Sequence, residues 1–231
     1  MSKWDDRYRS EAPPTQPSKL LVEFCSLLPT GGRALDVAAG GGRHSVYLAQ
    51  HGLATTAVDL SREGLERGRE LARQEHVHVD WVVADLEQFE IPSSQFDVIT
   101  CFFYRDPALY PRLSAALRPG GLIFYETYTR EPLAFSNSPR NPEHLAARQE
   151  LLRTFRALEV IFYREVWKSR GVASLVARRP QRGVACLRRQ AAVETGFCEP
   201  YMAQTFTPSS RSAVPFRPRF EPSWTIRLKA F

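Results

Sequence analysis

The sequence contains no long apolar run. No window of its 231 residues approaches the roughly 20 consecutive apolar residues that a membrane-spanning helix requires. The charged residues 1–9 also lack the apolar segment of a secretory signal. We therefore expect a globular protein without a membrane helix or a secretory leader, since its apolar content of 43% is enough for a full core.

Cysteine is scarce and scattered. The chain has four cysteines and no Cys-x-x-Cys pair, so their spacing favours neither a disulfide framework nor a cysteine-based zinc site. They are Cys25, Cys101, Cys186 and Cys198. Cysteines spaced in this way are typical of reduced thiols, and we expect a cytoplasmic location.

The body of the chain also lacks a strong charge of one sign. The formal net charge is +6, but residues 181–231 hold eight Lys and Arg against three Glu, which leaves a net charge of +1 for residues 1–180. Neutralisation of phosphates supplies most non-specific affinity for nucleic acids. The near-neutral body therefore argues against a nucleic-acid substrate and favours a small molecule.

Glycine, in contrast, is concentrated in one motif. The apolar run 34–37 includes Asp36 and is followed by three consecutive glycines, 40–42. A second apolar run, 53–58, ends in Asp59, which lies 17 residues after the last glycine. Glycines let the backbone approach a ligand closely, and an acid at the tip of the next strand can hold ribose hydroxyls. The motif predicts a nucleotide-type cofactor at the mouth of a parallel sheet.

Strand-like and helix-like segments alternate up to about residue 180. The expected strands cover residues 34–38, 53–58, 76–84, 96–102, 122–128, 158–164 and 172–177. The expected helices cover residues 20–28, 42–50, 61–73 (with Ser61 as N-cap), 107–117 and 142–153. Only seven residues separate the last two strands, fewer than a helical crossover needs. We predict an α/β fold: a Rossmann-like, seven-stranded, mostly parallel sheet with helices on both faces and an antiparallel C-terminal hairpin.

The hairpin separates this pattern from dinucleotide-binding dehydrogenase domains, whose sheets are all parallel. The order of motifs points in the same direction: Asp36-x-Ala38-x-Gly40-x-Gly42, Asp59, Asp85, the strand 96–99 and the Leu-Arg-Pro-Gly-Gly segment 117–121. With these motifs the chain resembles the class I methyltransferases that use S-adenosylmethionine.

The resemblance implies a set of cofactor-binding residues. Asp59 would bind both ribose hydroxyls, and Asp85 would accept a hydrogen bond from the adenine amino group, beside a backbone contact from Leu86. The full set is Trp4, Asp36, Ala38, Gly40, Gly42, Asp59, Leu60, Asp85, Leu86 and Phe102. Ala38 stands where the family usually has glycine, and alanine fits there without strain only if its φ is negative.

A narrower likeness covers more of the chain. Residues 4–8 (Trp-Asp-Asp-Arg-Tyr), 42–49 and 56–61 are similar to the tellurite-resistance and thiopurine group of small-molecule methyltransferases. In that group an N-terminal arm folds over the cofactor and shields it from water. We expect residues 1–18 to form such a lid, with packing of the arm against the flank of the domain as the alternative.

The rest of the chain divides into two parts. Residues 19–180 are expected to form the methyltransferase domain. Residues 181–231 form a basic, proline-rich tail with little apolar periodicity, a composition typical of poorly ordered segments. A tail that docks on the domain or binds an anionic partner is the alternative.

Three residues are expected on the acceptor side: Tyr104, Arg105 and Tyr128 lie at the ends of the fourth and fifth strands. The planar fork of Arg105 could pair with an anionic substrate. A soft sulfur, selenium or tellurium nucleophile needs no general base, whereas an oxygen or nitrogen acceptor requires one within about 2.6–3.2 Å. Asp106 and the two tyrosines are candidates for that base. We expect a small-molecule acceptor, in the first place a soft nucleophile.

A non-catalytic protein that keeps the fold as a binding or scaffold module is the alternative function. The three acids Asp36, Asp59 and Asp85 favour the enzyme, because a protein released from cofactor binding does not need them. A metal site is not expected, since His76, His78 and Asp80 share a strand face without a fourth ligand nearby.

Overall fold

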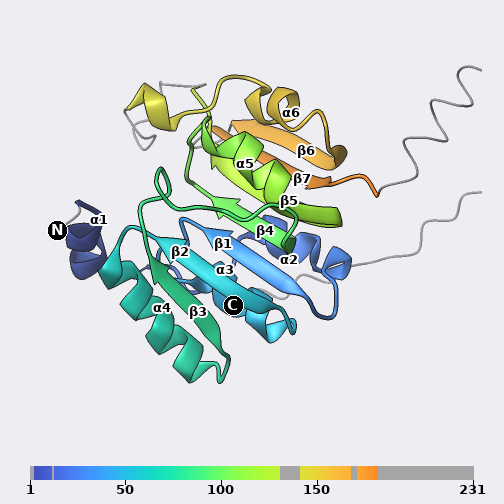
Figure 1. The fold of residues 1–231 in the computed structure, drawn as a ribbon. Coiled ribbons are helices and arrows are strands. Elements are labelled where there is room, and N and C mark those ends of the chain that lie inside the picture. The colour runs from blue at the N-terminus through green and yellow to red at the C-terminus, as the bar shows by residue number, and fades with distance from the viewer. Residues whose placement is uncertain (1–2, 12, 131–140, 168–170, 182–231) are drawn as a thin grey trace, which may run out of the picture.

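The computed structural model describes residues 3–11, 13–130, 141–167 and 171–181 (Figure 1). Its strands are β1 (Arg33–Val37), β2 (Ala54–Asp59), β3 (Val79–Val83), β4 (Phe96–Phe102), β5 (Leu117–Tyr128), β6 (Glu159–Trp167) and β7 (Gly171–Arg178). They form one seven-stranded sheet in the order β3-β2-β1-β4-β5-β7-β6. The first five run parallel, and β7 is antiparallel to both β5 and β6. The predicted fold class, with its C-terminal hairpin, is confirmed.

Helices cover both faces of this sheet (Figure 1). One face carries α2 (Lys19–Glu23), α3 (Arg43–Gln50) and α4 (Arg62–Gln74), and the other carries α5 (Leu109–Ala116) and α6 (Glu150–Thr154). Neighbours on β5 show the division, because successive side chains of a strand point to opposite faces. Phe124 belongs to the core cluster of α2 and α3, and Tyr125 to that of α5 and α6.

The order of the strands fixes where a ligand can bind. β1 and β4 are neighbours in the sheet, although β2 and β3 lie between them in the sequence. In open α/β sheets the crevice beyond the carboxyl ends of the strands at such a reversal is the usual binding site. The glycine turn after β1 and the loop after β4 both open at this point.

Two predicted elements differ at their boundaries for visible backbone reasons. The strand predicted over 122–128 begins earlier, at Leu117, because the Arg-Pro-Gly-Gly segment continues the sheet instead of turning. Gly120 N donates to Arg179 O, and Arg179 N donates to Gly121 O, both at 2.8 Å. The helix predicted over 142–153 is interrupted: the 3-10 turn η2 (Pro142–His144) and α6 are separate, since Gln149 has a φ of 56°.

Three further element boundaries can be compared with the sequence prediction. Ser61 is the N-cap of α4 as predicted, and its Oγ accepts from Gly64 N at 3.1 Å. The third strand begins at Val79 rather than at His76, whose φ is 55°. The helix predicted over 20–28 ends at Glu23 and is followed by the 3-10 turn η1 (Cys25–Leu27).

Within the described ranges, no helix has both the length and the apolar character to cross a membrane. The predicted tail, residues 181–231, lies outside the described residues except for Gln181. The predicted lid, residues 1–18, contains α1 (Lys3–Ser10).

Candidate active site

One cavity of about 550 Å³ opens beyond the carboxyl ends of β1 to β5. Its wall includes most of the residues that the sequence predicts for the cofactor and the substrate. These are Trp4, Ala38, Gly40, Asp59, Leu60, Asp85, Leu86, Phe102, Tyr104, Arg105 and Tyr128. Asp36 and Gly42, which were also predicted, do not belong to the wall. The volume is in the ordinary range for small-molecule and cofactor sites, about 300–1,000 Å³.

The turn after β1 uses left-handed backbone at three positions. Ala38, Gly40 and Gly42 have φ values of 55°, 55° and 72°. The condition for an unstrained Ala38, a negative φ, is therefore not met, and the alanine is held in a conformation that costs about 1–2 kcal/mol for an L-residue. Gly42 serves packing: a Cβ there would collide with the ring of Trp81.

Asp36 lies under the glycine turn in the protein interior and not at the cavity surface. Its side chain is buried and accepts from Ser45 Oγ at 2.6 Å and from Thr100 Oγ1 at 2.7 Å. Burial raises the pKa of Asp36 to about 6, although the two hydroxyls act against this shift. The acid therefore ties β1 to α3 and β4, and its carboxylate supports the turn from below.

Asp59 stands at the tip of β2 and faces the cavity. Its carboxylate accepts from Gly40 N at 2.8 Å and from Ser61 N at 2.7 Å. Burial raises the pKa of Asp59, and the backbone donors oppose that shift. The same side chain thus fixes the glycine turn and presents an acceptor to the cavity.

Asp85 follows β3 and lies on the same side of the cavity as Asp59. Its Oδ1 accepts from Glu87 N at 3.0 Å, which leaves Oδ2 without a described donor. Leu86 is buried beside it at 5% exposure. The two strand-end acids therefore frame one half of the cavity, over β2 and β3.

The N-terminal helix α1 docks against the start of α4. Ser61 Oγ donates to Asp5 Oδ1 at 2.7 Å, and Glu63 N donates to the same oxygen at 3.3 Å. A carboxylate suits this place because the first turn of a helix has free N–H groups. The helix brings Trp4 and Tyr8 to the cavity wall, and a Cβ at Gly40 would collide with the Tyr8 hydroxyl.

The half of the cavity over β4 and β5 is aromatic. Phe102 stacks on His44 with ring centroids 3.9 Å apart, and Phe103 lies 4.9 Å from Tyr128. Tyr104 completes this wall, and burial raises its pKa to about 12. Phe102 is only 6% exposed, so it contributes to the core as well as to the cavity.

Arg105 is not a free cation. Its guanidinium donates to Glu150 at 2.7 and 3.0 Å and, through Nη1, to Glu143 O at 2.6 Å. Glu150 also accepts from Tyr110 Oη at 2.9 Å and from Ala147 N at 2.9 Å. The planar fork that the sequence suggested for an anionic substrate is therefore engaged by the protein itself.

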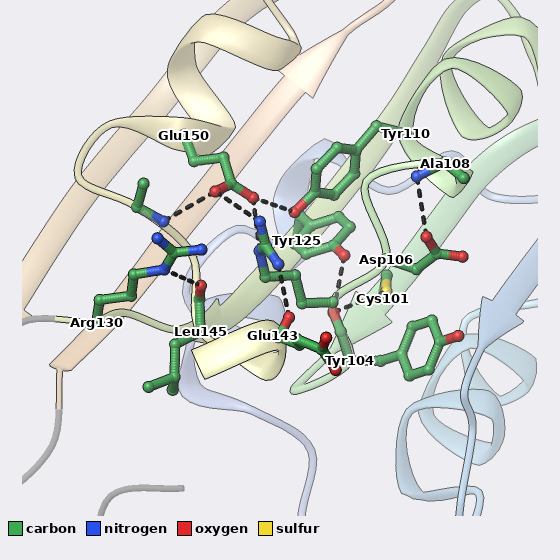
Figure 2. A network of polar contacts seen from close by, with 12 residues as sticks. Cys101, Tyr104, Asp106, Ala108, Tyr110, Tyr125, Arg130, Glu143, Leu145 and Glu150 are labelled. Atoms are coloured by element: carbon green, nitrogen blue, oxygen red, sulfur yellow. Dashed lines mark hydrogen bonds and ion pairs between the residues drawn. The ribbon is translucent and has the colours of Figure 1, made fainter. Parts of the chain in front are cut away.

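Asp106, one of the three predicted candidates for a base, caps the backbone ahead of α5. Its Oδ1 accepts from Ala108 N at 2.9 Å, ahead of α5, as Figure 2 shows. It is not among the residues that line the cavity. The two tyrosines named with it do lie in the wall.

Several wall residues escaped the sequence prediction, among them Arg43, His44 and His144. Arg43 and His44 directly follow the glycine motif, so their place in the sequence was a usable signal. Burial lowers the pKa of His44 well below its usual value, with a further contribution from Arg43. His144 had no such signal, because it falls inside a segment predicted as a continuous helix.

Metal ligation finds no support in the described part of the chain, where no group of three or more His, Cys, Asp and Glu residues could hold an ion. His78 and Asp80 form an exposed contact of 3.2 Å on β3 and its approach.

Part of the chain matches known proteins. Residues 34–121 match the family model of the methyltransferase domain. The ubiquinone biosynthesis O-methyltransferase of Xanthomonas axonopodis pv. citri is 32% identical over 153 residues, which cover 63% of this chain and 64% of that protein. The chain therefore spans less than two thirds of the length of this relative.

Solved structures agree on the fold. TehB from Haemophilus influenzae superposes with a TM-score of 0.60 at 19% identity, over 77% of this chain and 67% of that chain. An S-adenosylmethionine-dependent methyltransferase from Mesorhizobium loti superposes with a TM-score of 0.57 at 19% identity, over 70% of this chain and 98% of that chain. The seven-stranded sheet is the Rossmann-like fold of such proteins.

Proposed function

We propose that this chain, whose residues 34–121 match a methyltransferase domain, is an S-adenosylmethionine-dependent methyltransferase that acts on a small molecule. The observation that carries the proposal is the meeting of Asp59, Asp85 and the turn at Ala38–Gly40 in one cavity of about 550 Å³. Two acids at successive strand tips and a close-approach glycine suit a nucleoside ligand.

The described residues fit this cofactor. A Cβ at Gly40 would collide with the Tyr8 hydroxyl, so only glycine lets helix α1 lie this close to the turn. Asp59 would hold the ribose hydroxyls, Asp85 the adenine amino group, and the aromatic wall at Phe102 the sulfonium end. When bound, S-adenosylmethionine supplies a methyl group already activated on a cationic sulfur.

The contribution of the protein is then to position the acceptor and to exclude water. Positioning of reacting groups can lower a barrier by roughly 7–11 kcal/mol. Helix α1 lies over the glycine turn through Tyr8, and we propose that residues 1–18 act as a lid on the bound cofactor. The contacts of Asp5 with Ser61 and Glu63 N would hold this lid in place.

A soft sulfur, selenium or tellurium nucleophile is the first acceptor class that we propose. Two of the three candidate bases from the sequence support it: Asp106 does not line the cavity, and burial raises the pKa of Tyr104. The likeness of residues 4–8 and 42–49 to the tellurite-resistance and thiopurine group supports the same class.

An aromatic hydroxyl is the second acceptor class. The observation that favours it is the tilted aromatic pair of Phe103 and Tyr128 on the β4–β5 side, since aromatic side chains make favourable contacts with aromatic rings. A curated relative is named as an O-methyltransferase of ubiquinone biosynthesis. We further propose a cytoplasmic location, from the scattered cysteines, and no nucleic-acid substrate, from the near-neutral body.

Calorimetric titration with S-adenosylmethionine and with its demethylated product tests the enzyme against the scaffold alternative. The enzyme should bind both in the micromolar range, and lack of binding at millimolar concentration would remove the proposal. Methyl-transfer assays on thiols, tellurite, selenite and catechols then separate the two acceptor classes.

A further inference from the structure

We propose that His144 is the general base of this site and that it equips the enzyme for hydroxyl acceptors. The inference rests on the proposed methyltransferase function and deepens it by naming an acceptor class and the residue that serves it. Two observations support the inference. The exposed imidazole of His144 lies in the same cavity wall as Arg105, and hydrogen bonds anchor the backbone of both residues next to it.

The place of His144 puts it on the acceptor half of the cavity. It lies in η2, and its segment meets the end of β5 through a bridge between Thr129 and Ala146. The acids that suit the nucleoside, Asp59 and Asp85, lie at the same carboxyl ends of the strands but on the other side of the sheet reversal, over β2 and β3. A proton acceptor on the β5 side is therefore on the side of the sheet where the methyl acceptor must enter.

Arginine side chains anchor the backbone on both sides of His144. Arg105 Nη1 donates to Glu143 O at 2.6 Å, and Arg130 Nε donates to Leu145 O at 3.2 Å, so both neighbours of the histidine are tied (Figure 2). Arg105 is itself held by both oxygens of Glu150. A catalytic side chain gains from such support, because its geometry must be kept within a fraction of an ångström.

The imidazole itself is available. Its side chain is exposed, and it forms no hydrogen bond or ion pair with the described part of the chain. Histidine is the side chain best suited to proton transfer near neutral pH. An exposed ring can also pass its proton on to water after each turnover.

The other candidate bases at this end are engaged or protonated. Glu150 accepts four hydrogen bonds, from Arg105 twice, from Tyr110 and from Ala147. Cys101 is fully buried, and burial raises its pKa to about 12. Burial also raises the pKa of Tyr104, and Asp106 does not line the cavity.

The charged and titratable groups that share the wall with His144 are Arg7, Tyr8, Glu11, Arg43, His44, Asp59, Asp85, Tyr104, Arg105 and Tyr128, and Glu143 precedes it in the chain. Arg105 is paired with Glu150 and Arg7 with Glu11, and Glu143 Oε2 accepts from Asn141 Nδ2 at 3.5 Å. On the β2–β3 side, Asp59 accepts from Gly40 N and Ser61 N, and Asp85 accepts from Glu87 N.

The proton-transfer step balances with the named cofactor as co-reactant. The acceptor oxygen forms its bond to the methyl carbon while the carbon–sulfur bond breaks, and that electron pair stays on sulfur as the neutral thioether. The hydroxyl proton passes to a ring nitrogen of His144, which becomes an imidazolium and then releases the proton to water. A thiolate acceptor carries no proton and does not need this step.

The first experiment uses 4-nitrocatechol, whose absorption spectrum reports its ionisation, on the full chain saturated with the demethylated cofactor. At a pH where the free ligand is still protonated, the wild type should shift bound 4-nitrocatechol to the phenolate spectrum, and His144→Gln should bind it without that shift. The exposed His78→Gln variant is the matched control and should behave as the wild type. Binding of the demethylated cofactor and the melting temperature confirm that each variant is folded.

The second experiment compares acceptors. His144→Gln should lower kcat/KM for catechol by about 100-fold or more, the usual range for a general base. For a thiol that is ionised at the assay pH, the change should be less than about threefold, since no proton has to be removed. If His144 only positioned other residues, His144→Gln would lower kcat/KM by a similar factor for both acceptors.

The outcomes separate the two proposals. Failure of the wild type to bind the demethylated cofactor contradicts the proposed function. If the wild type binds the cofactor and methylates thiols, and His144→Gln still shows the full phenolate shift, only the role of His144 is overturned. Thiol methylation by a wild type that neither binds nor methylates catechols also overturns it, and equal losses on both acceptors reduce His144 to a structural residue.

Discussion

The guanidinium of Arg105 donates to both carboxylate oxygens of Glu150, with Nε–Oε1 and Nη2–Oε2 distances of 2.7 and 3.0 Å. The pair joins the loop after β4 to the start of α6, and Tyr110 on α5 adds a third donor to the same carboxylate. Both side chains are largely buried, at 10% and 14% exposure. The β4–β5 side of the cavity wall is therefore supported by an ion pair between segments that are far apart in the sequence.

Removal of one partner of this pair should be costly. Glu150→Gln leaves the Arg105 charge buried without its counter-ion, and we expect a loss of about 3 kcal/mol in the free energy of unfolding. Tyr110→Phe, which removes a single hydrogen bond to the same carboxylate, should lose about 1 kcal/mol. Urea denaturation of the two variants measures the difference. Losses of equal size would show that the ion pair has no special role.

Ala38 should be improved by replacement with glycine. Its φ of 55° costs alanine free energy that glycine does not lose, so Ala38→Gly should raise the free energy of unfolding by up to about 1 kcal/mol and should bind the cofactor at least as tightly. Ala39, its buried neighbour, is not among the residues with positive φ. Ala39→Gly is thus the control and should lose about 0.4–1 kcal/mol. A lower free energy of unfolding in both variants would contradict backbone strain at Ala38.

The buried acid behind the glycine turn should give a specific pH dependence. The pKa of Asp36 is raised from 3.8 to about 6 in the folded protein, so the folded state holds the proton more tightly than the unfolded state. Stability from this group is then fully present below pH 4 and falls as the pH rises towards 6, by about 2–3 kcal/mol in total. Denaturation of the wild type and Asp36→Asn between pH 4 and 7 checks it. A difference between the two that stays constant with pH would refute the shift.

The predicted tail should be dispensable for the domain. The seven-stranded sheet closes with β7 at Arg178, before the tail begins. A chain ending at Gln181 should keep its melting temperature within about 2 °C, the shift expected for less than about 1 kcal/mol in a domain of this size. It should also bind the cofactor with unchanged affinity. A marked loss of either property would favour the alternative in which the tail docks on the domain.

Sequence reasoning succeeded where local chemistry decides the structure. The spacing of the last two strands predicts the hairpin, because seven residues cannot hold a crossover helix, and the N-cap at Ser61 follows from a hydroxyl before an amphipathic helix. The glycine motif likewise predicts the turn that faces the cavity.

Sequence reasoning is least informative where residues far apart in the sequence decide the contacts of a side chain. Arg105 looked like a free substrate ligand, but its partner Glu150 lies 45 residues away and no local pattern links them. Asp36 looked like a cofactor ligand by its place in the motif, yet Ser45 and Thr100 take its carboxylate to the far side of the turn. The segment with His144 leaves the predicted helix at the extended Leu145, and the left-handed Gln149 precedes α6, so the apolar spacing did not reveal this turn.

The most direct test of the account is calorimetric titration of the full chain with S-adenosylmethionine, for the wild type, Asp59→Ala and the exposed Asp80→Ala as control. Asp59 faces the cavity, and loss of a charge-assisted pair of hydrogen bonds should weaken binding by about 1–3 kcal/mol, whereas Asp80→Ala should leave it unchanged. Micromolar binding by the wild type with this loss in Asp59→Ala is the predicted result. No binding by the folded wild type at millimolar cofactor, or equal affinity in Asp59→Ala, would contradict the account.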